Sequence, residues 1–253
     1  MPIVKNQDIH IFYEVIGQGQ PLVLLHGFAG NSKDWQRNGY VETLSDDYQL
    51  ILIDERGHGL SDKPHDPAAY EMQKRTSDIV AVLEDLDLRK SHVWGYSMGG
   101  EVCFGLAQFH ADCIESLIIG GMAPLPPAHP EAYDDQIAVL KSGIAAAADA
   151  WGYDSSERRE EFLRNDPKAL IASTIAARDW SGCEDILETL EIPCLIYVGK
   201  ADSFMFDAAK RGASQISKAK LVIIPGLDHG QAYADSRLIL PHVRDFLQNR
   251  IKK

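Results

Sequence analysis

The sequence predicts an α/β fold in which a mostly parallel central sheet is flanked by helices. Short apolar runs alternate with segments of helical spacing along most of the 253 residues. This alternation is typical of parallel strands joined by helices that cover both faces of the sheet. It stops after Met122 and resumes near residue 188, so we expect a helical insertion within a single α/β domain.

The first half of the chain contains the expected N-terminal hairpin and four expected buried strands. Residues 3–6 and 9–16 alternate in polarity and end at Gly17 and Gly19, which predicts an antiparallel hairpin. Continuous apolar runs predict strands that are buried on both faces, at 21–25, 48–53, 91–96 and 114–120. Helical spacing predicts the intervening helices, at 32–44, 71–86 and 98–110.

The second half contains the insertion and the end of the sheet. Prolines mark the start of the insertion, and helical segments follow at 137–151, 157–164 and 167–177. Strands are expected at 194–198 and 219–224, with helices at 205–217 and 235–250. The predicted organisation is therefore a core made of residues 1–122 and 188–253, with a helical cap at 123–187.

The composition indicates a globular protein and disfavours polyanionic partners. Hydrophobic residues make up 45% and charged residues 25% of the chain, and the net charge is −12. No cluster of Lys and Arg interrupts this acidity, so nucleic acid and anionic membranes are poor partners. We expect a monomer or a homodimer.

Cysteine usage and the absence of targeting signals favour a cytoplasmic location. The four cysteines form no C-x-x-C pair and show no zinc-ligand spacing, which predicts reduced, buried thiols. The N-terminal residues lack the apolar core of a signal peptide. No apolar run reaches the ~18 residues that a membrane-spanning helix needs.

Gly95-Tyr96-Ser97-Met98-Gly99 is the segment with the clearest chemical meaning. It lies between an expected strand and an expected helix, the setting in which a G-x-S-x-G motif presents a nucleophile. Ser97 would lie at a sharp turn and at a helix N-terminus, where backbone N–H groups favour developing negative charge. The motif alone could also be an ordinary glycine-rich turn with a capping serine.

A serine nucleophile needs a base and a carboxylate that orients the base. Asp202 follows the strand at 194–198 and His229 follows the strand at 219–224, so both belong to the same edge of a parallel sheet as Ser97. The order Ser, Asp, His is that of the G-x-S-x-G hydrolases. Two alternatives remain open: Asp202 could only cap the next helix, and Asp228 could be the acid.

With these residues, the chain resembles the α/β-hydrolase family, in particular its serine-dependent, esterase- and lactonase-like members with a small helical cap. Besides the segment around Ser97, the resemblance rests on His26-Gly27-Phe28, on Asp54-Glu55-Arg56-Gly57-His58-Gly59-Leu60-Ser61, and on Gly199-Lys200-Ala201-Asp202 with His229. It covers nearly the whole chain. It implies a catalytic Ser97, His229 and Asp202, and an oxyanion hole formed by the N–H groups of Phe28 and Met98. A serine in place of an aspartate nucleophile disfavours epoxide hydrolysis and dehalogenation.

We expect the other polar residues of these motifs to have structural roles. His26 would support the oxyanion loop, and His58 lies in a tight glycine-bounded turn. Asp54 and Arg56 are expected to form a buried or half-buried network. Glu101 suits the start of its helix on electrostatic grounds, and a role in sensing substrate is the alternative.

The expected substrate pocket is apolar and is lined by Tyr96, Met122, Trp151 and Trp180, although each of these also fits simple core packing. The predicted activity is hydrolysis of a small carboxylic ester or lactone through an acyl-enzyme, with no metal and no cofactor. Two alternatives are hydrolysis of a C–C bond in a ring-cleavage product, and a ligand sensor that keeps the triad but signals through its cap.

Overall fold

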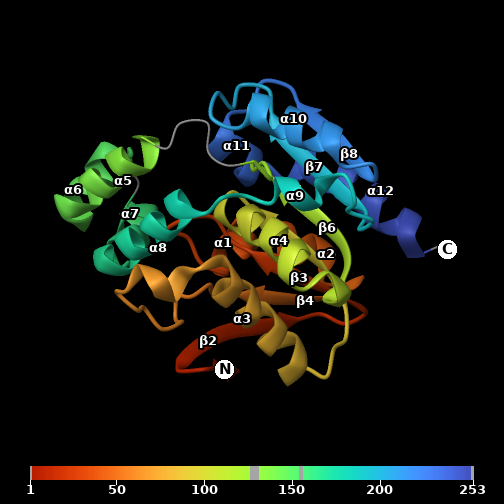
Figure 1. The fold of residues 1–253 in the computed structure, drawn as a ribbon, viewed down its shortest axis with the longest axis horizontal. Coiled ribbons are helices and arrows are strands. Elements are labelled where there is room, and N and C mark those ends of the chain that lie inside the picture. Colours follow the sequence, from red (N-terminus) through yellow and green to blue (C-terminus); the bar gives the residue numbers. More distant parts are fainter. Residues whose placement is uncertain (1, 126–130, 154–155, 252–253) are drawn as a thin grey trace.

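An eight-stranded sheet organises the residues that the computed structural model describes, which are 2–125, 131–153 and 156–251 (Figure 1). In spatial order its strands are β1 (Ile3–Asn6), β2 (Ile9–Ile16), β4 (Tyr48–Ile53), β3 (Gln20–Leu25), β5 (Ser91–Tyr96), β6 (Ile114–Gly120), β7 (Cys194–Gly199) and β8 (Ala219–Ile224). β1 and β2 pair antiparallel, β2 runs antiparallel to β4, and the remaining neighbours are parallel. The predicted hairpin and the predicted mostly parallel sheet are confirmed.

The continuous apolar character of the central strands reflects burial on both faces of the sheet. In β3, Val23 and Leu25 belong to one buried cluster, and Leu22 and Leu24 belong to a second cluster on the opposite face. All four side chains are fully buried. Burial of each side chain stabilises the fold by roughly 1.5–3 kcal/mol, so such a strand contributes to two cores at once.

Helices cover both faces of the sheet. The face that contains Val23 is covered by α3 (Met72–Asp85), α4 (Met98–Phe109), α9 (Glu184–Leu187) and α10 (Phe206–Gln215). The face that contains Leu24 is covered by α1 (Lys33–Arg37), α2 (Tyr40–Leu44), α11 (His229–Ala234) and α12 (Ser236–Ile251). Two short 3-10 helices, η1 (Pro67–Tyr70) and η2 (Ala111–Cys113), complete the connections.

Glycines account for two differences from the predicted helices. The helix expected at 32–44 is two helices, because Gly39 between them has a φ of 79° that a continuous right-handed helix excludes. The helix expected at 137–151 is likewise interrupted at Gly143, whose φ is 106°. The short helix α11, which begins at His229, has no counterpart among the predicted helices.

The inserted helices form a separate group at the left of Figure 1. They are α5 (Glu131–Lys141), α6 (Ile144–Ala150), α7 (Ser156–Leu163) and α8 (Pro167–Asp179). Leu140, Phe162 and Leu170 form a small core with Ala29, which comes from the loop after β3. Residues 183–187, at the end of the predicted cap, pack into the main core instead. The division into a core and a cap at 123–187 stays a prediction.

Buried ion pairs join α3 to the loop after β4. The guanidinium of Arg56 donates two hydrogen bonds to Asp78, at 2.6 and 2.7 Å. The network expected between Asp54 and Arg56 is therefore not the one observed. Asp54 instead accepts the N–H groups of Ser32 and Leu60, at 2.7 and 2.8 Å, because its carboxylate lies between their two loops.

Two further findings concern membranes and thiols. No helix in the described ranges is long and apolar enough to cross a membrane. None of the four cysteines, which all lie in the described ranges, forms a disulfide; Cys103, Cys183 and Cys194 are buried and Cys113 is half-buried.

Gly99→Ala tests how tightly α4 packs under the sheet. A Cβ at this position would lie 2.3 Å from the carbonyl oxygen of Leu25. Helix propensity favours Ala over Gly by ~1 kcal/mol, but a clash with backbone costs about 2 kcal/mol or more. We therefore expect a net loss in the free energy of unfolding, measured by urea denaturation. Gly230→Ala is the control, because it lies in α11 and its Cβ would meet nothing closer than 3.8 Å. Equal stability of the two variants would contradict this packing.

Candidate active site

Ser97 lies at the sharp turn between β5 and α4. Its φ of 53° and ψ of −115° place a non-glycine residue in a region that costs of order 1–3 kcal/mol. The Ser97 N–H donates a 2.8 Å hydrogen bond to the carbonyl oxygen of Gly120, which holds the turn against β6. A Cβ on Gly95 would lie 2.1 Å from the Gly99 carbonyl oxygen, so the turn requires glycine there.

His229 lies between Ser97 and Asp202. Its Nε2 is 3.0 Å from the Ser97 Oγ, and its Nδ1 is 2.7 Å from the Asp202 Oδ2. The three residues follow β5, β7 and β8, whose carboxyl ends meet at one edge of the parallel sheet. The structure therefore brings the three predicted residues into one hydrogen-bonded chain. Their catalytic role stays a prediction.

The two oxygens of Asp202 have different partners. Oδ1 accepts the N–H groups of Phe204 and Met205, at 3.1 and 2.9 Å, and Oδ2 faces His229. Asp202 thus organises the turn before α10 and also orients the imidazole. Burial raises the pKa of Asp202, but the hydrogen bond and charge of His229 and the two N–H groups outweigh it, so the pKa lies below its ordinary value. Asp202 is an ionised acceptor at neutral pH.

Asp228, the alternative acid, has a different role. Its side chain accepts the Gln231 N–H at 2.8 Å, and the Gln231 side chain accepts the Asp228 N–H at 3.1 Å. This reciprocal pair is a capping box that starts α11. The Asp228 side chain is exposed and caps the helix that begins with His229. The carboxylate that contacts the imidazole is that of Asp202.

The loop after β3 lies beside Ser97. A Cβ on Gly27 would be only 3.7 Å from the Ser97 Cβ, so this loop approaches the turn closely. His26 fixes the loop: its Nδ1 is 2.8 Å from the Gly27 carbonyl oxygen, and its Nε2 accepts the Glu55 N–H at 3.1 Å. Phe28 therefore lies next to Ser97, as an oxyanion donor would require. The use of its N–H and that of Met98 stays a prediction.

Two hollows meet at Ser97. The larger, about 490 Å³, includes Tyr96, His229 and Tyr233 in its lining. The smaller, about 290 Å³, includes Met98, Glu101 and Trp151. Both are lined by Phe28, Ser97, Gln136 and Phe204. A small organic molecule can therefore extend to either side of the Ser97 hydroxyl.

The four predicted pocket residues lie in different places. Tyr96 and Trp151 line the hollows at Ser97, and the Tyr96 hydroxyl also donates to the His229 carbonyl oxygen. Met122 packs beside Gly100 in the main core. Trp180 follows α8 and packs against the main core, and it lines a separate hollow between η1, the start of α3 and the end of α8.

Sequence reasoning missed most of the lining from the inserted helices. Tyr133, Gln136 and Val139 recur three residues apart on one face of α5 and line the smaller hollow. Thr174 faces them from α8, where its hydroxyl oxygen is 3.0 Å from the Gln136 Nε2. The i, i+3 spacing was visible in the sequence, but it does not reveal which face of a helix meets a cavity.

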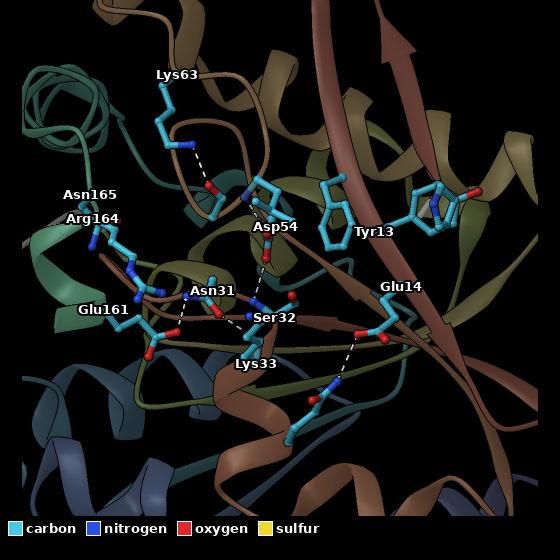
Figure 2. A pocket seen from close by; sticks show the side chains of 15 residues that line it. Tyr13, Glu14, Asn31, Ser32, Lys33, Asp54, Lys63, Glu161, Arg164 and Asn165 are labelled. Atoms are coloured by element: carbon cyan, nitrogen blue, oxygen red, sulfur yellow. Dashed lines mark hydrogen bonds between the residues drawn. The ribbon is translucent and has the colours of Figure 1, made fainter. Parts of the chain in front are cut away.

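A third hollow, of about 320 Å³, lies apart from Ser97 and is shown in Figure 2. It lies between β2, the loop after β3 and the end of α7. Most of its polar groups have protein partners, including the Asn31 amide with Glu161 at 2.8 Å and the Lys63 ammonium with the Gly59 carbonyl oxygen at 2.6 Å. None of the three residues of the hydrogen-bonded chain lines it. Within the described ranges, no group of three or more His, Cys, Asp or Glu side chains could hold a metal ion.

Comparison with known proteins establishes the family. A model of the alpha/beta hydrolase fold matches residues 20–152, which is more than half of the chain. The chain therefore belongs to the alpha/beta hydrolase family, and the resemblance found in the sequence is confirmed. The non-heme chloroperoxidase CPO-A1 of Kitasatospora aureofaciens is 28% identical to this chain, over 92% of this chain and 93% of that protein.

Solved structures agree on the fold. The esterase EaEST from Exiguobacterium antarcticum matches with a TM-score of 0.86 at 25% identity, over 99% of both chains. The enol-lactonase from Burkholderia xenovorans LB400 matches with a TM-score of 0.87 at 22% identity, over 98% of this chain and 100% of that one. At this identity the second likeness shows the fold alone.

Asp202→Asn and Asp228→Asn distinguish the two acids. An asparagine at 202 favours the wrong imidazole tautomer, so kcat for p-nitrophenyl butyrate should fall by roughly 10⁴-fold. Asn is a good helix cap, so Asp228→Asn should change kcat by no more than a few-fold. The reverse pattern of losses would assign the orienting role to Asp228.

Proposed function

We propose that this protein is a serine hydrolase that cleaves a small carboxylic ester or lactone through an acyl-enzyme. The observation that carries the proposal is the chain of hydrogen bonds from the Ser97 hydroxyl through His229 to Asp202. A serine hydroxyl is a weak nucleophile unless a base within hydrogen-bond reach takes its proton. The 3.0 Å separation between Ser97 and His229 supplies that reach.

In the proposed reaction, Ser97 Oγ attacks the carbonyl carbon while His229 Nε2 takes the hydroxyl proton. The tetrahedral intermediate collapses, the bond to the leaving oxygen breaks, and His229 returns the proton to the alcohol. Water then attacks the acyl-enzyme with His229 again as the base, which releases the acid and restores Ser97. Asp202 stays ionised throughout and stabilises the imidazolium, consistent with its lowered pKa.

The proposed oxyanion hole uses the N–H groups of Phe28 and Met98. Met98 is the first residue of α4, so its N–H belongs to the unpaired N-terminal groups of that helix. Phe28 lies on the loop that approaches Ser97. Donors of this kind stabilise the negative charge on the former carbonyl oxygen, and the loss of one costs about 10²–10³-fold in kcat.

We also propose that residues 123–187 act as the cap over this site. In support, α5 and α8 contribute Gln136, Thr174 and Val139 to the smaller hollow. At about 290 Å³ this hollow suits a short acyl group better than a triglyceride chain.

The names of the relatives favour this choice and add a second candidate. An esterase and an enol-lactonase are among the proteins that share the fold. One relative is named as a non-heme chloroperoxidase. As a second candidate we propose that hydrogen peroxide attacks the same acyl-enzyme in place of water, which would release a peracid and restore Ser97. Halogenation of a dye with bromide and peroxide, measured beside ester hydrolysis, separates these activities.

Ser97→Ala tests the proposed nucleophile. Residual catalysis would then rest on the oxyanion hole and binding alone, so kcat for p-nitrophenyl butyrate should fall by at least ~10³-fold. Circular dichroism and thermal melting check that the variant is folded. A folded variant with near wild-type turnover would exclude Ser97 as the nucleophile.

A screen of the wild-type protein tests the ligand-sensor alternative. Protein that binds these compounds but hydrolyses no ester, lactone or dienone would favour the ligand sensor.

A chain-length series tests the proposed cap. Apolar pockets gain roughly 0.8 kcal/mol for each buried CH₂ until they are full, after which overpacking costs energy. We expect kcat/KM for p-nitrophenyl esters to rise from acetyl to about butyryl or hexanoyl and then to fall by ten-fold or more. The series runs from two to sixteen carbons below the critical micelle concentration. An optimum at twelve carbons or beyond would indicate an open, lipase-like groove.

A further inference from the structure

The two hollows at Ser97 contain different halves of the proposed catalytic centre. His229 lines the larger hollow, and Met98 lines the smaller one. His229 must protonate the leaving oxygen, so in the proposed mechanism the leaving alcohol extends into the larger hollow, here named the leaving-group arm. The acyl group then extends into the smaller hollow, the acyl arm. This assignment rests on the proposed function.

The acyl arm combines aromatic rings with negative charge. Four aromatic side chains line it, those of Phe28, Tyr133, Trp151 and Phe204. Its ionisable lining includes the carboxyl groups of Glu101 and Asp135, whereas Lys, Arg and His are absent from the described residues around it. Aromatic faces and carboxylates both attract organic cations, and neither attracts anions.

Glu101 has one oxygen without a protein partner. The residue is 4% exposed, and its Oε2 accepts a 2.8 Å hydrogen bond from the Arg75 Nη1. Within the described part of the chain, no hydrogen bond reaches its Oε1. Unlike Glu55 Oε1, this oxygen is not fully buried, and Glu101 forms part of the lining of the acyl arm. A positive charge in the acyl arm would stabilise the Glu101 carboxylate by Coulomb attraction, without a hydrogen bond.

The charges behind the acyl arm do not balance. Arg75 is the one positive charge between Glu55 and Glu101, with contacts of 2.9 and 2.8 Å, and all three side chains are buried. Glu55 Oε1 is also buried without a hydrogen-bond partner. The neighbouring Arg56 is occupied by Asp78 and cannot compensate. Burial and the charge of Glu55 raise the pKa of Glu101, whereas Arg75 lowers it. With both carboxylates ionised, the cluster of Glu55, Arg75 and Glu101 carries a net charge of −1 at the wall of the acyl arm.

We propose that the acyl arm binds an organic cation, so that the preferred substrate carries a substituted ammonium group on its acyl side. Glu101 would be the main specificity-determining residue, Asp135 would add negative charge at the more exposed part of the arm, and the aromatic rings would face the cation. A cation there supplies the positive charge that the cluster lacks.

The leaving-group arm has a different electrostatic character. Arg37 and Arg158 line it together with Asp34 and Glu161, so both signs of charge are present. Arg37 is already paired with Asp34 and Glu161. A cation on the alcohol side of the substrate should therefore gain little. The preference for a cation should depend on which side of the ester carries it.

The test compares two pairs of esters of matched shape. On the acyl side, p-nitrophenyl 4-(trimethylammonio)butanoate is paired with the neutral p-nitrophenyl 5,5-dimethylhexanoate. On the alcohol side, butyrylcholine is paired with 3,3-dimethylbutyl butyrate. We expect the ratio of kcat/KM, cation over neutral, to be about ten or more for the acyl pair and near one for the alcohol pair. An acyl ratio of one or less would overturn the proposal.

Three variants locate the effect. Glu101→Gln should lower the acyl ratio by roughly ten-fold and Asp135→Asn by a smaller factor, whereas Glu188→Gln, an exposed carboxylate outside the arm, should not change it. Glu101→Gln could disturb Arg75, so circular dichroism and melting come first. Asp135 is exposed and its variant carries the test if Glu101→Gln does not fold. An unchanged ratio in the folded acyl-arm variants would contradict the assignment.

Failure of the proposed function gives a different result. Hydrolysis of the neutral esters without a cation preference would contradict only this inference. If no ester is hydrolysed, the proposed function fails, and calorimetry with butyltrimethylammonium decides whether the arm binds a cation. Binding that is weakened by Glu101→Gln or Asp135→Asn would support the cation site, and absence of binding by the wild-type protein would exclude it.

Discussion

The turn at Ser97 is the constraint on which the rest of the structure depends. The strained backbone of Ser97 persists only because its surroundings allow no other arrangement. Gly95 lets the chain fold back on Gly99, and Gly99 lets α4 approach the carbonyl of Leu25, so β3, β5 and α4 meet at van der Waals distance. Because of this packing, the Ser97 hydroxyl lies at the carboxyl edge of the sheet, where the loops after β7 and β8 also lie. The loop after β3 lies beside the same serine.

In the loops after β7 and β8, the residues that organise the starts of α10 and α11 also position the imidazole of His229. Asp202 organises the turn before α10 with one oxygen and holds His229 with the other. Asp228 caps α11 and so sets the position from which His229 reaches Ser97. Both carboxylates support the imidazole, one by direct contact and one through the helix that begins with it. Asp202 therefore makes the turn contacts that precede α10 and also the contact to His229 that the proposed catalytic role requires.

A buried charge cluster connects the core to the cavity. Breaking one partner of a buried ion pair typically costs 3–5 kcal/mol, so Arg75 and its two carboxylates belong to the stability of the fold. Glu101 is the member that also lines the cavity, one turn after the proposed nucleophile. In the proposed mechanism, α4 and the turn before it would present Ser97, the Met98 N–H and the Glu101 carboxylate to one substrate, so that chemistry and specificity would depend on a single rigid element.

The sequence alone determined the strands, the motifs at their carboxyl ends, and Ser97 and His229 as members of one polar site. It left Asp202 and Asp228 as alternatives for the carboxylate beside His229. Period-two and continuous apolar patterns are local, and carboxyl ends of parallel strands must share an edge. Tertiary structure decided what depends on packing between distant segments: that Asp202, not Asp228, contacts His229, that Arg56 pairs with Asp78, and that Trp180 lies outside the cavity while Tyr133 and Gln136 line it. Helical spacing predicts which residues share one face of a helix. Which other element or cavity that face contacts depends on the tertiary structure.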